Sequence, residues 1–322
     1  MEHFFDAIWE RMRSQQSQLV VGLDPRLDRM PEELVEHALS YHGSSEAIAV
    51  AIEQFNRQVI DAVAPHAVAV KCQIAFYEMW GLRGLTAYSN TLDYAREVGL
   101  PVIGDVKRND IGSTARAYAA AHLGWPEEED QEDEEEDEED EWFGPGELVA
   151  DAITINPYFG SDGVNPFLER AQETGRGLFA LVKTSNSSAG EIQDLQTQHG
   201  PVYERVGTLV EKWGEDYIGE SGYSLLGAVV GATYPQTLQV LREIMPHTFF
   251  LVPGVGAQGA SAGDAAAAFD RNGGGALVNS SRGIIYAYDR DPYIDRYEES
   301  RWTEAVKAAA RDTQRRLWEA TH

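Results

Sequence analysis

Eight short apolar runs, rich in valine, isoleucine and leucine, recur along the chain, and most of them precede a segment with helical periodicity. Runs that are apolar on both faces are typical of strands in a parallel sheet covered by helices. Eight strand–helix units close most naturally into a (β/α)8 barrel, so we predict this α/β fold for one domain of residues 1–322. The runs occupy residues 19–24, 67–73, 101–107, 152–157, 177–185, 225–233, 249–257 and 275–283.

An open, doubly wound sheet is the alternative α/β architecture. Dinucleotide-binding sheets of that kind carry a G-x-G-x-x-G turn after the first strand, and no such turn follows residues 19–24 here. The closed barrel is therefore preferred. The helical patterns that support it lie at residues 44–64, 113–124, 234–245, 261–270 and 300–320.

A tract of dense acidity interrupts the pattern between the third predicted helix and the fourth strand. Residues 127–141 contain 14 acidic side chains, and without them the chain still has 39 acidic against 26 basic residues, a net charge of −13. A block of like charges this dense is expected to be disordered and solvated, so we interpret residues 126–142 as a loop insertion on the barrel face away from the chemistry. Docking of a basic partner is the less favoured interpretation.

The remaining composition limits the class of protein. Acidic residues dominate and there are five lysines against 21 arginines, which is the composition expected in a salt-loving organism, and we infer a halophilic archaeon. No basic patch is evident for nucleic acid, and no apolar run is long enough to cross a membrane. The lone cysteine, Cys72, is interpreted as a small buried side chain in a reducing cytoplasm.

Polar side chains gather where the predicted strands end. In a barrel these ends converge on one site, and three of the five lysines (Lys71, Lys107 and Lys183) occupy them. A chain that uses arginine nearly everywhere else has kept lysine here, which favours a chemical role. The full set at the strand ends is Asp24, Lys71, Asp105, Lys107, Thr184, Ser185, Gln258 and Arg282.

The sequence GDVKRND, residues 104–110, places a lysine between two acids. Residues two apart on a strand share a face, so Asp105 and Lys107 should point the same way, while a loop could fold Asp110 back toward them. Opposite charges beside a lysine favour its ammonium form, which makes Lys107 a positioned acid. A salt-bridged strand end followed by a helix cap would use the same residue types.

The seventh and eighth strands end in PGVGAQG and NSSRG. Glycines let a backbone approach a ligand closely, and barrels often hold a phosphate at this pair of loops. Arg282 could bind phosphate with two parallel hydrogen bonds, and Gln258 could donate another. Ordinary turn glycines are the alternative explanation.

These blocks together resemble orotidine 5'-phosphate decarboxylase of the longer bacterial and archaeal type. The matching blocks are GDVKRNDIGSTARAYA, VGLDP, VKCQIAFYE, TINPYFGSDGVNPF, LVKTSNSSAGEIQDLQ, GAVVGAT, FLVPGVGAQG and NSSRGIIYA. The resemblance runs from about residue 19 to residue 290. It departs in KCQ, where the family pattern has KPN, and in TSNSS, where TSNP is more usual.

The resemblance implies a role for each matching residue. Lys107 corresponds to the lysine that protonates C6 of the pyrimidine as carbon dioxide leaves, Asp105 flanks it, and Lys71 completes the charge network and contacts the ribose. Asp110 corresponds to an acid supplied across a homodimer interface. Asp24 and Thr114 match ribose contacts, Ser185 matches a pyrimidine contact, and Gln258 and Arg282 match phosphate ligands.

The resemblance also implies a reaction that uses neither a metal nor an organic cofactor. A metal-dependent keto-sugar-phosphate decarboxylase of the same superfamily shares the D-x-K-x-x-D pattern, but it carries a metal-binding glutamate where this chain has Lys71. A catalytically idle nucleotide-binding or scaffolding barrel is the alternative from another class. The intact charged residues argue against it.

Overall fold

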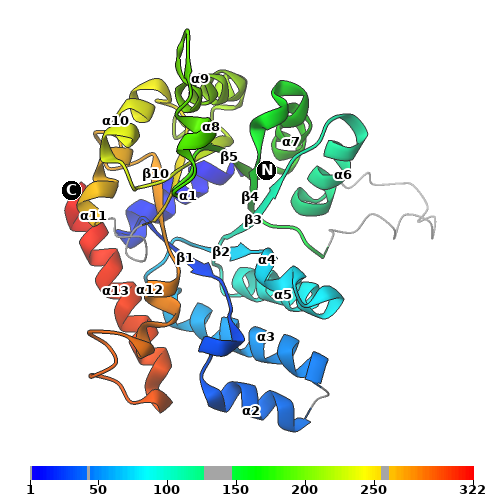
Figure 1. Ribbon diagram of the computed structural model, residues 1–322, viewed down its shortest axis with the longest axis vertical. Helices are drawn as coiled ribbons and strands as arrows, with labels where there is room; N and C mark the ends of the chain where they lie inside the picture. Colours follow the sequence, from blue (N-terminus) through cyan, green and yellow to red (C-terminus); the bar gives the residue numbers. More distant parts are fainter. Residues whose placement is uncertain (1, 42–43, 127–146, 255–260) are drawn as a thin grey trace.

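The computed structural model describes residues 2–41, 44–126, 147–254 and 261–322. Eight parallel strands form a closed barrel in the order β1-β10-β9-β8-β5-β4-β3-β2, and helices surround it (Figure 1). Closure confirms the predicted barrel and excludes the open sheet. The barrel strands are β1 (Leu19–Leu23), β2 (Ala69–Gln73), β3 (Val102–Arg108), β4 (Ala152–Ile155), β5 (Gly177–Lys183), β8 (Leu226–Val230), β9 (Phe250–Pro253) and β10 (Ala276–Ser280).

The longer helices pack their apolar stripes on the outer surface of the strands, and each predicted helical pattern contains a helix. At residues 261–270 the helix is a single α-turn continued by a 3₁₀ turn. A small antiparallel pair, β6 (Gln196–Thr197) and β7 (Gly200–Pro201), lies outside the barrel sheet. The helices are α1 (Phe4–Gln15), α2 (Glu32–Tyr41), α3 (Ser44–Val63), α4 (Ala75–Glu78), α5 (Gly81–Glu97), α6 (Gly112–Leu123), α7 (Ser161–Thr174), α8 (Gly190–Gln193), α9 (Val202–Gly214), α10 (Pro235–Ile244), α11 (Ala262–Ala265), α12 (Arg282–Ile285) and α13 (Trp302–Thr321).

Helix α1 precedes the first strand and packs against the N-terminal end of the barrel. Phe5 is fully buried; its ring stacks on Phe249 with centroids 4.9 Å apart and meets Phe179 edge-on at 5.3 Å. Phe4 lies so close to Gly177, at the start of β5, that a Cβ built on the glycine would come within 2.4 Å of the ring. Phe4 and Phe5 form an aromatic plug at this end of the barrel. Active sites in such barrels lie at the opposite, C-terminal end of the strands.

The acidic segment lies outside the described residues, but the elements on either side of it are defined. Helix α6 ends at Leu123 and β4 begins at Ala152, so the connection starts and finishes at the N-terminal end of the barrel. The placement of residues 126–142 away from the mouth stays a prediction. In the described part of the chain, no helix is long and apolar enough to span a bilayer.

Truncating the aromatic plug tests whether α1 stabilises the barrel. We expect Phe5→Ala to lower the free energy of unfolding by about 3–5 kcal/mol, because a large buried ring is lost and a cavity remains. Leu39→Ala, on an exposed side chain of α2, is the control and should change it by less than about 0.5 kcal/mol. Urea unfolding followed by circular dichroism measures both. A loss below about 1 kcal/mol for Phe5→Ala would show that the plug is dispensable.

Candidate active site

A pocket of about 290 Å³ lies at the C-terminal end of the strands. Strands β2, β3 and β4 line one side of it with Lys71, Asp105, Lys107 and Thr154. Strands β5, β8 and β9 lie opposite in the barrel order and contribute an apolar wall. That wall consists of Leu181, Val229, Leu251 and Pro253, and the remaining lining residues are Thr184, Ser185, Asn186 and Asn279.

Asp105 is the centre of the charged wall. Its Oδ2 accepts hydrogen bonds from Lys71 Nζ at 2.8 Å and from Gln73 Nε2 at 2.9 Å. Its Oδ1 accepts from Lys107 Nζ and from Thr154 Oγ1, the latter at 2.9 Å. A carboxylate offers about four acceptor positions, so this buried group is fully satisfied by four donors, two of them cationic.

The charges fix each other's protonation. Burial alone would raise the pKa of Asp105, but the two neighbouring ammonium groups and their hydrogen bonds hold it well below its usual range. Burial likewise opposes the charge on Lys71, yet Asp105 and Asp24 raise the pKa of this lysine above its ordinary value. Asp105 and Lys71 therefore form an ionised pair at neutral pH.

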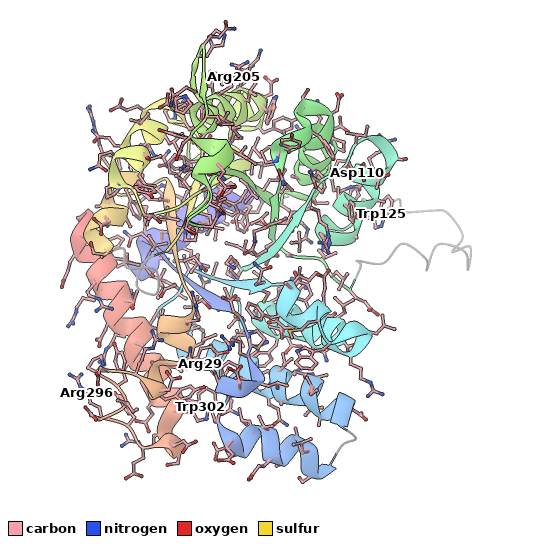
Figure 2. The ribbon with its side chains drawn as sticks, viewed as in Figure 1. Arg29, Asp110, Trp125, Arg205, Arg296 and Trp302 are labelled. Atoms are coloured by element: carbon pink, nitrogen blue, oxygen red, sulfur yellow. The ribbon has the colours of Figure 1, made fainter. Side chains whose placement is uncertain are left out.

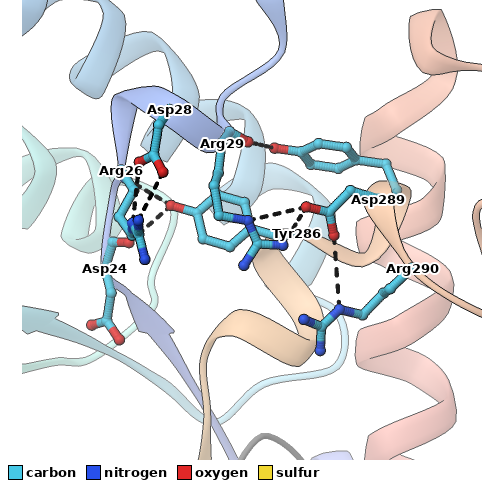
Figure 3. Close-up of polar contacts among 8 residues, drawn as sticks. Asp24, Arg26, Asp28, Arg29, Tyr286, Asp289 and Arg290 are labelled. Atoms are coloured by element: carbon cyan, nitrogen blue, oxygen red, sulfur yellow. Dashed lines mark hydrogen bonds and ion pairs between the residues drawn. The ribbon is translucent and has the colours of Figure 1, made fainter.

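Asp24 is held at the end of β1 by the segment that follows β10. Its Oδ2 accepts a hydrogen bond from Ser281 Oγ at 2.6 Å, and its backbone oxygen accepts one from the Tyr286 hydroxyl at 3.0 Å. The Arg26 N–H donates to the same hydroxyl at 2.7 Å, and the Arg29 guanidinium lies over the Tyr286 ring (Figure 3). The other carboxylate oxygen of Asp24 is buried and has no hydrogen-bond partner among the described residues.

Asp110 and Thr114 are not part of this pocket within one chain. Asp110 accepts a hydrogen bond from the Ile111 N–H at 2.7 Å, and its backbone lies beside Gly163 at the start of α7. Figure 2 shows it next to the ribbons of α6 and α7, at the rim of the barrel. Thr114 is exposed on the first turn of α6. Both side chains belong to an outer edge of the molecule.

The other predicted residues divide in the same way. Ser185 lines the pocket directly after β5. Arg282 begins α12, exposed and outside the pocket lining, although it follows β10 by only two residues. Gln258 lies outside the described residues.

Lys183 does not join the other two strand-end lysines in the pocket. Its buried ammonium pairs with Asp194 and lies 5.1 Å from the centroid of the Tyr203 ring, and it does not line the pocket. The register of β5 against β8 shifts between Leu181 and Lys183, so the two side chains do not continue one inward-facing row. Lys183 therefore holds outer segments together. By contrast, burial raises the pKa of the Cys72 thiol to about 12, as expected for the inert side chain that the sequence indicated.

Sequence reasoning missed Gln73, Thr154 and Asn279. Gln73 follows Lys71 by two positions and so shares its face of β2, and Thr154 is the one polar side chain in the four-residue strand β4. Asn279 carries the same signal in β10, where it follows a run of apolar residues. A polar side chain facing the interior of a barrel strand was the available clue.

Comparison with known proteins agrees with this architecture. Residues 17–297 match the model of the "Orotidine 5'-phosphate decarboxylase / HUMPS family". An orotidine 5'-phosphate decarboxylase of Rhodopirellula baltica is 43% identical over 289 residues, 90% of each chain, and one of Caldicellulosiruptor bescii is 38% identical over 296 residues, 92% of this chain and 93% of the other. The solved structure of Leishmania donovani OMP decarboxylase has a TM-score of 0.68 and 31% identity, covering 96% of this chain and 99% of that one. On sequence and fold alike, the chain belongs to the orotidine 5'-phosphate decarboxylase / HUMPS family.

Proposed function

We propose that this protein decarboxylates orotidine 5'-phosphate to uridine 5'-phosphate, the last step of pyrimidine nucleotide synthesis. The observation that carries the proposal is the Lys71–Asp105–Lys107 array. In this member of the family, the array faces an apolar wall across one pocket. The two bacterial relatives compared above are named for this activity, and this chain aligns with nearly their whole length. Exposed Arg282, two residues after β10, would bind the phosphate, and Gln258 stays a predicted second phosphate ligand.

The geometry supports a simple charge mechanism. Breaking the bond between C6 and the carboxyl carbon releases carbon dioxide and leaves an electron pair at C6. Lys107 stabilises that pair electrostatically and then donates a proton to it. Asp105 is held in place by four donors. It would lie beside the carboxylate of the bound substrate, and repulsion between the two negative charges would destabilise that carboxylate. Phosphate contacts lie away from the reacting carbon, and their binding energy would offset the repulsion between Asp105 and the substrate carboxylate.

The metal-dependent sugar-phosphate activity fits the pocket less well. Lys71 stands at the end of β2, and its ammonium would repel a divalent cation there. Within the described parts of the chain, no three His, Cys, Asp or Glu side chains gather in a way that could hold a metal. We propose that the reaction proceeds with the side chains alone, in which case a chelator should leave its rate unchanged.

We further propose a homodimer in which Asp110 and Thr114 complete the pocket of the partner subunit. Both lie on an outer edge, and large apolar side chains are exposed on the same and the neighbouring loop: Ile111 is 54% exposed, Phe159 is 50% exposed and Tyr158 is 80% exposed. Phe159 and Asp110 both adjoin Gly163, so the loops after β3 and β4 form one surface. An exposed apolar patch of this kind beside a functional acid is expected at a subunit interface.

The setting of the enzyme is also proposed, from composition. One buried cysteine fits a reducing cytoplasm, and the excess of acids over bases outside residues 127–141 fits a salt-rich one. The two curated relatives named above are bacterial, so they give no support to an archaeal source. We regard residues 1–322 as one catalytic barrel, with residues 126–142 inserted on its N-terminal side.

Replacing the proposed proton donor tests the activity itself. Wild-type protein should deplete the absorbance of orotidine 5'-phosphate with or without a chelator. Lys107→Ala should lower kcat at least about 1,000-fold, because proton delivery and charge stabilisation are both lost. Calorimetric binding of uridine 5'-phosphate should survive. Lys307→Ala, on an exposed side chain of α13, is the control and should retain wild-type kcat. Wild-type protein that does not consume the substrate would refute the proposed function.

Complementation between two inactive variants tests the shared site. Asp110→Ala and Lys107→Ala homodimers should each be nearly inactive. A mixed dimer has one site with both lesions and one with neither, so each mixed dimer should recover about half of the wild-type activity, as two-fold exchange requires. Subunit exchange is verified with differently tagged chains. If exchange occurs and activity does not return, Asp110 acts within its own chain.

The ionised state of Asp105 predicts a pH-dependent contribution to stability. A carboxyl whose folded pKa is depressed stabilises the protein above its unfolded pKa, near 3.8, and this contribution is lost as the pH falls toward the folded value. The difference in free energy of unfolding between wild type and Asp105→Asn should therefore be steady from about pH 5 to 7 and shrink below about pH 4. Urea unfolding across this range measures it. A difference that stays constant down to about pH 3 would mean that Asp105 is not ionised in the folded protein.

A further inference from the structure

Strand β3 leaves the regular ladder just where it carries the central lysine. Its register with β4 pairs Gly104 with Ile153 and then Arg108 with Ile155, so β3 advances four residues while β4 advances two. Within this bulge Lys107 has φ +47°, a left-handed conformation that side-chain-bearing residues adopt at a cost. Gln16, at the C-terminal end of α1, is the only other non-glycine residue with positive φ in the described ranges.

A bulge of this kind leaves backbone groups without their ladder partners. The N–H of Lys107 donates instead to Thr154 Oγ1 at 3.0 Å. Thr154 is only 1% exposed, so the hydroxyl that accepts this bond is held in place by the packing around β4. The hydroxyl is therefore what satisfies the displaced backbone.

The same hydroxyl donates to Asp105 Oδ1 at 2.9 Å. The direction of both bonds is fixed by chemistry, because a backbone N–H can only donate and an ionised carboxylate can only accept. Thr154 thus joins the backbone of Lys107 to the carboxylate that holds the Lys107 ammonium. Both ends of this lysine, main chain and Nζ, are linked through one side chain from the neighbouring strand.

We propose that Thr154 is a positioning residue that holds Lys107 in its left-handed turn and Asp105 in its orientation, so that Nζ is fixed in the pocket before substrate binds. The effect on turnover rests on the proposed function, whereas the effect on the geometry of Lys107 does not. Because the hydroxyl acts through Lys107, its loss should lower kcat and leave KM nearly unchanged.

The variants separate the hydroxyl from the shape of the side chain. Thr154→Val keeps the branched volume and removes the hydroxyl, and Thr154→Ser keeps the hydroxyl. Thr248→Val is the matched control: Thr248 is equally buried, at 1% exposure, and donates to a carboxylate, Glu211 Oε2, at 2.8 Å. It lies at the opposite end of the barrel, next to the start of β9.

We expect kcat for orotidine 5'-phosphate to fall about 10- to 100-fold in Thr154→Val, with KM within about threefold. Thr154→Ser should retain kcat within about threefold, and Thr248→Val within about twofold, although the latter loses a similar hydrogen bond. Equal losses in Thr154→Val and Thr248→Val, or in Thr154→Val and Thr154→Ser, would overturn the proposal, because general destabilisation or lost volume would then be the cause.

Crystal structures of the two Thr154 variants supply a readout that does not depend on turnover. In Thr154→Val, Lys107 should leave the positive-φ region or its Nζ should lose contact with Asp105, and Thr154→Ser should keep both. If wild-type protein does not turn over orotidine 5'-phosphate, the proposed function fails, and this structural comparison still decides the role of Thr154. An unchanged Lys107 in Thr154→Val would overturn that role.

Discussion

One buried carboxylate organises the mouth of this barrel. Asp105 accepts from Lys71, Gln73, Lys107 and Thr154, and these donors come from three adjacent strands. An ionised group at 8% exposure is tolerated only when every lone pair is used and opposite charges lie next to it. Removing any one donor leaves the others arranged around an unsatisfied acceptor. Any rearrangement of the array would leave a buried charge or acceptor unpaired, so the array resists movement. Electrostatic catalysis requires groups that are fixed in this way.

The barrel supplies the second requirement, which is an asymmetric pocket. Strands β2 and β3 present charge and β4 presents a hydroxyl, while β5, β8 and β9 present aliphatic side chains across the interior. Apolar walls keep the local dielectric low, so the fields of Lys107 and Asp105 act at nearly full strength on a bound group. Where the first and last strands meet, Tyr286 and Ser281 hold Asp24 beside the array. Each wall depends on closure, because the opposing strands are far apart in the sequence.

The chain that follows β3 places Asp110 outside the pocket that contains Lys107. Asp110 lies only three residues after Lys107, yet it turns away from the pocket and beside the apolar loop of Tyr158 and Phe159. The proposed homodimer would use this divergence, with Lys107 in one pocket and Asp110 presented to the partner subunit. The bulge at Lys107 contributes to this divergence, since it changes the direction of the chain between the two residues.

The sequence by itself determined the barrel, its eight strands and the core of the charged array. Runs that are apolar on both faces are buried most favourably in a parallel sheet covered by helices. The two-residue repeat of a strand predicts that Asp105 and Lys107 lie side by side, and their ion pair agrees with that prediction although β3 bulges at Lys107. The sequence did not determine which strand-end residues meet. Lys183 points outward and pairs with Asp194, while Gln73 and Thr154 point inward and donate to Asp105. The outward turn of Lys183 coincides with the register shift of β5 against β8, whereas Gln73 and Thr154 lie on regular strand faces and meet Asp105 only because β2, β3 and β4 are neighbours in the barrel. Local patterns fix which face a side chain takes in a regular strand, whereas only the assembled barrel decides where a strand departs from regularity.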